Sequence, residues 1–203
     1  MVKLRSAFYL QEDVLNVARE LLGKIIFTQI NNEITGGMIT ETEAYAGTTD
    51  RASHAWNHRR TSRTGIMYRA GGVAYVYLCY GIHPLFNFVT AKPEIPHAVL
   101  LRGIYPLFGC DAMENRTGKK STGKSFSDGP GKVTKALGIS VSDNGISLTG
   151  NRIWVEDHGI VVKDEGVLIT PRIGVAYAGS DASLPYRFLI ADPGKIYGQK
   201  KTS

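Results

Sequence analysis

Cysteine is scarce in this 203-residue chain, where only Cys79 and Cys110 occur. Two cysteines cannot build the disulfide framework of a small secreted domain, and both can stay reduced and buried inside a cell. The first residues, Met1–Ser6, lack the apolar core of a signal peptide. No apolar run approaches the roughly 20 residues that a membrane-spanning helix needs. These absences lead us to expect a soluble intracellular protein.

Repeats and linkers are absent as well. No segment recurs and no stretch divides the chain clearly, so residues 1–203 are expected to form one domain. Hydrophobic residues make up 43% of the chain, which supports a sizeable core. The 24 Lys and Arg outnumber the 18 Asp and Glu, and the net charge of +6 favours polyanions such as nucleic acid, phosphorylated ligands or membrane surfaces. Charge alone does not choose among these partners, since many basic proteins bind none of them.

Apolar residues at helical spacing predict a helix over residues 12–22. A second helix over 132–137 is expected to begin near Pro130 and to stop at Gly138. Between the helical regions, residues 117–131 are expected to form a mobile basic loop without periodicity. The remaining expected elements are a helix over 107–116 and short strands over 98–101, 153–155, 160–162, 167–169, 173–176 and 188–190.

Two hairpins are predicted in the first half of the chain. Asn31 and Asn32 separate the strand-like runs 24–30 and 33–45, and Asn tolerates the positive φ of a hairpin turn. Aromatic and β-branched residues flank the stretch 80–84 and predict a second hairpin, with a tyrosine at its tip. Ordinary sheet packing is the alternative for these tyrosines. Because hairpins outnumber crossover helices, we expect an α+β fold with a mostly antiparallel sheet.

The strand expected over 39–45 carries two carboxylates. Period two places Ile39, Glu41, Glu43 and Tyr45 on one face. A solvated outer face is the simpler interpretation, because charged residues are mostly exposed. If the face is internal, each buried charge needs a partner or a function. The two Cα atoms would lie about 6.5 Å apart at the rise of a strand, which suits acid–base hydrolysis of a glycosidic bond.

Residues 118–125 match the G-x-x-x-x-G-K-[ST] phosphate-loop pattern letter for letter, ending in Lys124 and Ser125. The run 188–192 even resembles an apolar strand that ends in a magnesium-binding Asp. A working phosphate loop follows a buried strand and opens a helix, whose N-terminus then binds phosphate. Here polar residues precede the loop and Gly129–Pro130 breaks the chain after it. A phosphate-loop nucleotide hydrolase is therefore retained only as the weakest alternative.

His54 and His58 stand four residues apart, a spacing that would put both on one face of a helix as metal ligands. The residues between them give no helix signal, and spacing supplies no third ligand. We therefore expect no metal site here.

Several separate motifs follow one another along the chain. They are Glu41-Thr42-Glu43-Ala44-Tyr45-Ala46-Gly47, His54, Tyr75-Val76-Tyr77-Leu78-Cys79-Tyr80-Gly81, Asn87, Val99-Leu100-Leu101-Arg102, Gly129-Pro130-Gly131-Lys132, Arg172-Ile173-Gly174-Val175 and Pro185-Tyr186-Arg187-Phe188. Together, and in this order, they resemble the alkyladenine (methylpurine, 3-methyladenine) DNA glycosylase family. The resemblance runs from about Phe8 to Ile190, nearly the whole chain.

The resemblance implies a fold and an activity. The fold would be a single α+β domain with a curved, mostly antiparallel sheet, flanking helices and a protruding β-hairpin. The activity would be that of a monofunctional base-excision enzyme, which flips a damaged purine nucleotide out of double-stranded DNA and hydrolyses its N-glycosidic bond. It would need no metal or other cofactor and would have no lyase activity. The basic chain without repeats is itself expected to be a monomer, and an intracellular protein of this kind would lie in the cytoplasm or nucleoid, or in the nucleus of a eukaryote. A non-catalytic module that binds damaged DNA with the same pocket remains the main alternative.

The resemblance also assigns the catalytic residues. Glu43 matches the general base that activates water for attack on C1′ of the flipped sugar, and a nearby guanidinium would favour its ionised form. Arg102 matches the arginine that helps to hold this water. The carbonyl of Ile173 would accept a hydrogen bond from the same water, and Glu41 is interpreted as a structural neighbour.

Four further residues match the walls of the base pocket. Tyr45 and Tyr77 would stack on the flipped purine and offset the cost of flipping it, which is a few kcal/mol. His54 would hydrogen-bond the edge of the base. Asn87 matches the residue that rejects guanine by crowding its exocyclic amine.

The remaining matches concern the DNA itself. Tyr80 matches the intercalating tyrosine that fills the gap left by the flipped nucleotide. Gly131 and Lys132 resemble a segment that contacts the phosphate backbone. The sequence departs from the family pattern at 82–84, where Ile-His-Pro makes the hairpin more rigid, and at 56–58, where Trp-Asn-His replaces a smaller stretch. The first departure bears on the wedge at Tyr80 and the second on the range of lesions.

Overall fold

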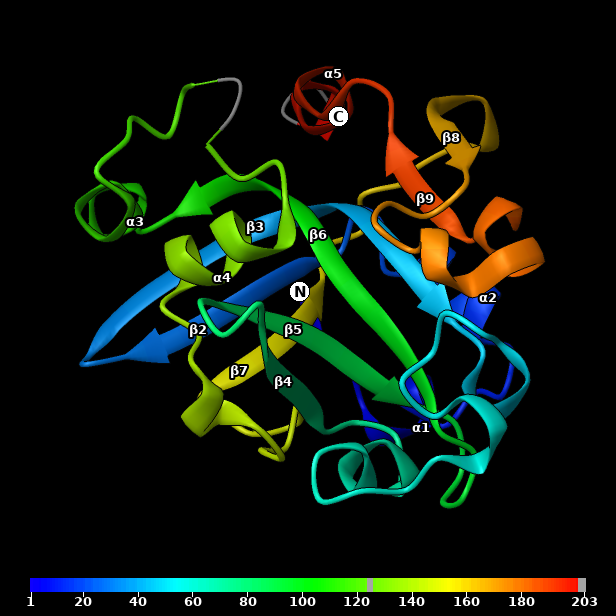
Figure 1. Cartoon of the computed structure of the whole chain (residues 1–203). Coiled ribbons are helices and arrows are strands. Elements are labelled where there is room, and N and C mark those ends of the chain that lie inside the picture. Colours follow the sequence, from blue (N-terminus) through cyan, green and yellow to red (C-terminus); the bar gives the residue numbers. More distant parts are fainter. Residues whose placement is uncertain (124–125, 201–203) are drawn as a thin grey trace.

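Two long strands, β3 (Glu33–Tyr45) and β6 (His97–Phe108), run through the middle of one mostly antiparallel sheet (Figure 1). The computed structural model describes residues 1–123 and 126–200. Its main strand order is β1-β7-β2-β3-β6-β5-β4, while β9 pairs with β3 and β8. The other strands are β1 (Val2–Lys3), β2 (Ile25–Ile30), β4 (Ala74–Cys79), β5 (His83–Thr90), β7 (Ile153–Asp157), β8 (Val167–Thr170) and β9 (Arg187–Ile190).

The helices are short and cover the sheet. They are α1 (Ser6–Tyr9), α2 (Val14–Glu20), α3 (Cys110–Thr117), α4 (Pro130–Leu137) and α5 (Pro193–Lys200). Helix α2 packs against β3 and β6, and α4 packs against β5 and β6. The hydroxyl of Thr42 on β3 donates to the carbonyl of Ala18 on α2 at 2.8 Å. The expected α+β class is confirmed.

Strand β3 has different neighbours along one edge. Its first half pairs with β2, from Glu33 opposite Ile30 to Met38 opposite Ile25. Its last residues pair with β9, where Glu43 lies opposite Arg187. Strand β6 follows the other edge over most of the length of β3. A segment near the C-terminus is thereby brought beside the Glu41–Tyr45 stretch.

Two irregularities interrupt the pairing of β3 with β6 near Glu41. Glu41 lies opposite Gly103 and Thr42 opposite Leu101, so Arg102 faces no residue in the register. The carbonyl of Arg102 instead accepts a hydrogen bond from the Gly129 amide at 2.8 Å. A bulge of this kind bends a strand and redirects its side chains. Simple alternation therefore fails here, and Thr42 is as fully buried as Glu43.

Both predicted hairpins are confirmed. Asn31 and Asn32 adopt φ values of 52° and 62° between β2 and β3. At the tip of the β4–β5 hairpin Tyr80 has φ 50° and Gly81 has φ 71°, and the Ile82 amide donates to the Cys79 carbonyl. The Tyr80 side chain is 92% exposed, so it projects from the tip as expected.

Other elements differ from the sequence-based expectation. The strand predicted over 98–101 extends over the whole of β6, and the helix predicted over 107–116 begins only after Gly109, which has φ 65°. Residues 160–162 and 173–176 form no strand. Strand formation requires a free sheet edge, and an apolar run does not reveal one. The predicted loop is shortened at both ends, because α3 includes Thr117 and α4 begins at Pro130.

The remaining elements are short 3₁₀ helices in the connections between the strands and helices. They are η1 (Gly47–Thr49), η2 (Trp56–His58), η3 (Thr64–Tyr68), η4 (Val141–Asp143), η5 (Asp164–Gly166) and the longer η6 (Ala176–Ser183). Elements η1, η2 and η3 form the long connection between β3 and β4, and η6 lies between β8 and β9.

A pair of glycines before β4 tests how closely the chain packs against α1. A Cβ on Gly71 would lie 2.1 Å from the carbonyl oxygen of Tyr9, whereas a Cβ on Gly65 would meet nothing within 4 Å. We expect Gly71→Ala to lower the free energy of unfolding by about 1–3 kcal/mol, because backbone must move. Gly65→Ala should leave it within about 1 kcal/mol. Urea denaturation of both variants measures this, and equal effects would contradict the packing.

Candidate active site

A fully buried carboxylate, that of Glu43 on β3, lies at the centre of the candidate site. One of its oxygens, Oε1, accepts a hydrogen bond from the Ile173 amide at 2.8 Å and lies 3.3 Å from Nε of Arg102. The other, Oε2, accepts from the hydroxyl of Tyr45 at 2.9 Å. Ile173 therefore reaches Glu43 through its N–H group, a contact that the sequence did not reveal.

Burial raises the pKa of Glu43, because the charged form loses hydration. The positive charge of Arg102 and the hydrogen bonds from Ile173 and Tyr45 act in the opposite direction. The guanidinium does favour the ionised form, as expected, but burial is the larger effect. A carboxylate with a raised pKa and fixed donors is a suitable general base.

Arg102 contacts two carboxylates, those of Glu41 and Glu43. Its Nε donates to Glu41 Oε1 at 2.8 Å, and Nε of Arg187 donates to the same oxygen at 2.6 Å. Glu41 and Arg102 are mostly buried, so this contact is shielded from solvent. Glu41 thus holds both arginines beside Glu43, which agrees with its interpretation as a structural neighbour.

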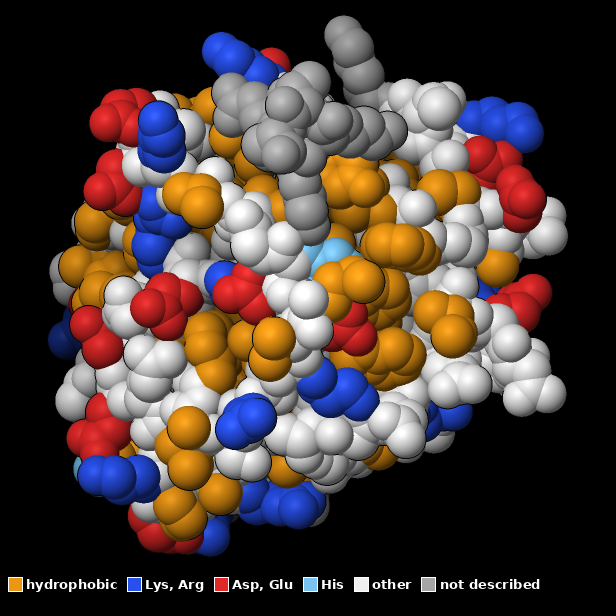
Figure 2. Space-filling model, turned by 180° about the vertical axis from the view of Figure 1, so that it is seen from behind, with side chains coloured by type: hydrophobic (Ala, Val, Ile, Leu, Met, Phe, Trp, Pro, Cys, Tyr) orange, Lys and Arg blue, Asp and Glu red, His pale blue; other side chains and the backbone are white. Residues whose placement is uncertain are grey.

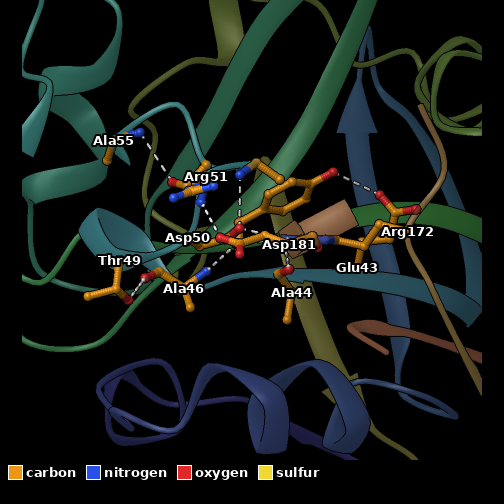
Figure 3. Close-up of polar contacts among 12 residues, drawn as sticks. Glu43, Ala44, Ala46, Thr49, Asp50, Arg51, Ala55, Arg172 and Asp181 are labelled. Atoms are coloured by element: carbon orange, nitrogen blue, oxygen red, sulfur yellow. Dashed lines mark hydrogen bonds and ion pairs between the residues drawn. The ribbon is translucent and has the colours of Figure 1, made fainter. Parts of the chain in front are cut away.

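A buried ion pair between Asp50 and Arg172 lies close to Glu43 (Figure 3). The guanidinium of Arg172 binds both oxygens of Asp50, at 2.5 and 2.9 Å, and both side chains are almost inaccessible. Arg172 also donates to the Ala44 carbonyl at 2.9 Å, and its guanidinium lies over the Tyr45 ring, 4.9 Å from the centroid. Since Ile173 is the next residue, this pair fixes the amide that binds Glu43.

Aromatic side chains line a small, open pocket, and Tyr45, which binds Glu43, is one of them. Tyr45 connects the two, because its ring lines the pocket while its hydroxyl binds the carboxylate. All four residues expected to form the base pocket lie together there. The lining residues are Tyr45, Ala52, His54, Met67, Tyr75, Tyr77, Asn87, Ala98 and Tyr177.

His54 is held in a fixed position within the pocket. Its Nδ1 lies 2.8 Å from the hydroxyl of Tyr75, and its ring meets Tyr77 edge-on with centroids 4.7 Å apart. Burial, together with the positive charges of Arg63 and Arg59, lowers the pKa of His54 to about 4. The imidazole is therefore neutral at neutral pH and is suited to hydrogen bonding.

Asn87 is anchored beside His54, since its Nδ2 donates to the Tyr75 carbonyl at 3.1 Å. Tyr75 and Tyr177, which line the pocket, and the ion pair of Asp50 and Arg172 had no predicted role in the site. Tyr75 could have been found, because period two places it on the same strand face as Tyr77. Asp50 carried no local signal of its partner, which lies 122 residues away.

The β4–β5 hairpin and the start of α4 form a second candidate surface. An open groove between them is lined by Tyr80 and Ile82 on the hairpin and by Gly131 and Lys132 on the helix. The Thr134 hydroxyl donates to the Pro84 carbonyl at 2.7 Å and joins the two elements. Tyr80 holds a positive φ, a conformation that costs about 1–3 kcal/mol in a non-glycine residue and often marks a functional position.

The positive charge of the protein is not concentrated on one part of the described back face. On the described part of the back face, basic and acidic side chains are interspersed (Figure 2). Lys132, beside the hairpin, is half-exposed and pairs with Asp128 at 2.8 Å. The excess positive charge is therefore not gathered on the back face.

Comparison with known proteins identifies the family. A profile described as "Methylpurine-DNA glycosylase (MPG)" matches residues 7–193. The chain belongs to the methylpurine-DNA glycosylase family. This membership confirms the resemblance drawn from the sequence motifs and makes the chain a DNA glycosylase of the kind that acts in DNA repair.

Curated relatives span almost the same length as this chain. Proteins named "Putative 3-methyladenine DNA glycosylase" are 45% identical in Chlamydia felis, over 92% of this chain and 95% of the relative. The protein of that name from Chlamydia pneumoniae is 43% identical, over 95% of this chain and 98% of the relative. A more distant protein of that name, from Natranaerobius thermophilus, is 35% identical, over 94% of this chain and 96% of the relative.

The competing motifs do not fit the glycosylase fold as their chemistries require. Helix α3, not a strand, precedes the phosphate-loop match at Gly118, and Lys124 and Ser125 lie outside the described residues. His58 follows Asn57 with positive φ at both, so the two histidines share no helix face. Across residues 1–123 and 126–200, no cluster of three His, Cys, Asp or Glu is placed to hold a metal ion. In the same residues no helix is long and apolar enough to cross a membrane.

The Asp50–Arg172 pair yields a stability prediction. We expect Asp50→Asn to lower the free energy of unfolding by about 3–5 kcal/mol, because it leaves a buried guanidinium without a counter-charge. Asp128→Asn is the matched control, since it removes a carboxylate from an exposed pair and should change stability by no more than about 1 kcal/mol. Urea denaturation of both variants measures the difference. Similar small losses in the two would contradict the role given to the buried pair.

Proposed function

We propose that this family member is a monofunctional DNA glycosylase that excises alkylated or deaminated purines with a water molecule activated by Glu43. Its substrates would be bases of the 3-methyladenine, 7-methylguanine, hypoxanthine and ethenoadenine type in double-stranded DNA. The observation that carries the proposal is the hydrogen bond from Tyr45 to Glu43, which joins the aromatic pocket to the buried carboxylate. A flipped base in the pocket would bring its sugar next to Glu43.

The reaction requires one water molecule and one general base. Glu43 takes a proton from the water while the oxygen of the water attacks C1′. The N-glycosidic bond breaks, and its electrons leave with the departing purine. Arg102 and the carbonyl of Ile173 would hold the water, while the Ile173 amide holds Glu43 itself. Since the attacking group is water, the product is an abasic sugar in an intact strand, and no lyase step or cofactor is needed.

The leaving base determines how much further help is needed. A 3-methyladenine or 7-methylguanine base already carries positive charge and leaves readily, so water and position suffice. Hypoxanthine and ethenoadenine are neutral and require a proton. Tyr45 and Tyr77 would stack on either kind of base, and Asn87 would crowd the exocyclic amine of guanine.

The hairpin surface would engage the DNA. Tyr80 would enter the base stack from the minor groove and occupy the place of the flipped nucleotide. Its exposure at the hairpin tip supports this role. Gly131 and Lys132 would contact the backbone at the start of α4, close to the same tip. The enzyme would act as a monomer inside the cell, in the cytoplasm or nucleoid or, in a eukaryote, the nucleus.

The catalytic proposal predicts the behaviour of Glu43→Gln. This variant should lose base release by a factor on the order of 10² to 10⁴, because the amide cannot accept the proton. Single-turnover release from a duplex with one hypoxanthine measures the rate, and electrophoretic mobility shift measures DNA binding, which should be retained. Glu33→Gln, on the same strand but half-exposed, is the control and should keep full activity.

Two outcomes would contradict this proposal. Full activity in Glu43→Gln would remove Glu43 from the reaction. Tight binding of damaged DNA by the wild-type protein without any base release would instead favour the non-catalytic binding module.

The DNA surface predicts a change in salt dependence. Lys132→Ala should reduce the slope of log affinity against log salt concentration by about one, because one phosphate contact releases about one counterion. Lys92→Ala is the control, since Lys92 is also exposed and paired with an acid but lies at the other end of β5. Fluorescence anisotropy from low to moderate salt measures both slopes, and an unchanged slope in Lys132→Ala would place that lysine outside the interface.

A further inference from the structure

Tyr177 differs from the other residues that line the base pocket. It comes from η6, at the far end of the chain from Tyr45, and its side chain is 69% exposed. Asn87 and Met67, by contrast, lie in the pocket interior and are almost inaccessible. A lining residue that is also largely exposed lies at the mouth of a pocket.

Hydrogen bonds hold Tyr177 at this position. Its hydroxyl donates to the carbonyl of Ala52 at 3.0 Å, and the amide of Ala52 donates to Asp50 at 2.9 Å. Asp50 is the partner of Arg172, which precedes Ile173 and lies five residues before Tyr177. The ring is therefore positioned by the same ion pair that positions the amide bound to Glu43.

The hydroxyl end of Tyr177 lies within the electrostatic influence of the site, although most of the residue is exposed. Burial raises the pKa of Tyr177, and the negative charges of Asp50 and Glu43 raise it further, against the effect of Arg172. Burial is also the main cause of the raised pKa of Tyr77, to which Tyr177 contributes. Both phenols are neutral at neutral pH. Because the hydroxyl of Tyr177 is bound to Ala52, the part it offers to a ligand is its ring.

We propose that Tyr177 closes the mouth of the base pocket over the flipped nucleotide and limits the size of the base that is accepted. This inference rests on the proposed function, since it assumes that a base enters the pocket. An exposed aromatic ring gains free energy when a ligand covers it, and a rigid wall rejects larger ligands by collision. Tyr177 would thus favour compact purines such as hypoxanthine over the extended ring system of ethenoadenine.

The test compares the two bases in Tyr177→Ala. The ratio of kcat/KM for ethenoadenine over hypoxanthine should rise about tenfold, the scale on which pocket size discriminates. Tyr177→Phe keeps the ring but loses the hydrogen bond to Ala52, so its ratio should lie between those of the wild type and Tyr177→Ala. Tyr105→Ala, a partly exposed tyrosine of β6 outside the pocket, is the control. Circular dichroism verifies the fold of each variant.

A binding measurement separates this inference from the proposed function. In the Glu43→Gln background, Tyr177→Ala should lower the ratio of the Kd for an ethenoadenine duplex to the Kd for a hypoxanthine duplex, because ethenoadenine is then bound relatively more tightly. If the wild-type protein releases neither base, the proposed function fails, and this ratio decides the role of Tyr177 alone. The inference would be overturned if the ratio were unchanged in both assays, or if Tyr177→Ala reduced activity toward both bases equally. Absence of any damage-selective binding would overturn it as well.

Discussion

The buried pair of Asp50 and Arg172 is the contact on which the site depends. Removing two charges from water is costly, and here two hydrogen bonds between the partners and further ones to backbone groups offset that cost. The pair joins the loop after β3 to the segment before η6, which are far apart in sequence. Ile173 and Tyr177 follow Arg172, while Ala52 follows Asp50. One interaction therefore positions both a donor to Glu43 and, through Ala52, the Tyr177 side chain of the aromatic pocket.

Strand β3 supplies the other half of the site, and its irregularity matters. In a regular antiparallel pairing of β3 with β6, the direction of the Arg102 side chain would follow from simple alternation along the strand. The bulge instead leaves Arg102 between Glu41 and Glu43, where it contacts both carboxylates. Glu43 is then subject to opposing influences: burial raises its pKa, and Arg102, Ile173 and Tyr45 lower it. This balance is what a general base requires near neutral pH.

Local chemistry predicted the hairpins well. Asn31 and Asn32 indicate the first turn because Asn tolerates positive φ, and the aromatic and β-branched residues on both sides of 80–84 indicate the second hairpin. The bulge at Arg102 was not predictable from alternation, since the contact behind it comes from Gly129, more than twenty residues away. Spacing alone suggested an exposed face for Glu43, and its burial followed from packing that no local pattern contains. The resemblance brought Tyr45, His54, Tyr77 and Asn87 together correctly; their roles stay predictions.

The pH dependence of base release tests the central claim most directly. A duplex with one 7-methylguanine is suitable, because its positive charge removes the need for an acid. Glu43 must be ionised to act, so a raised pKa means that activity falls as pH drops through a value above 4.5. The account predicts this acidic limb, with abasic DNA and an intact strand as product in the presence of EDTA. Release that stays constant to pH 4 or below, or cleavage of the strand, would contradict it.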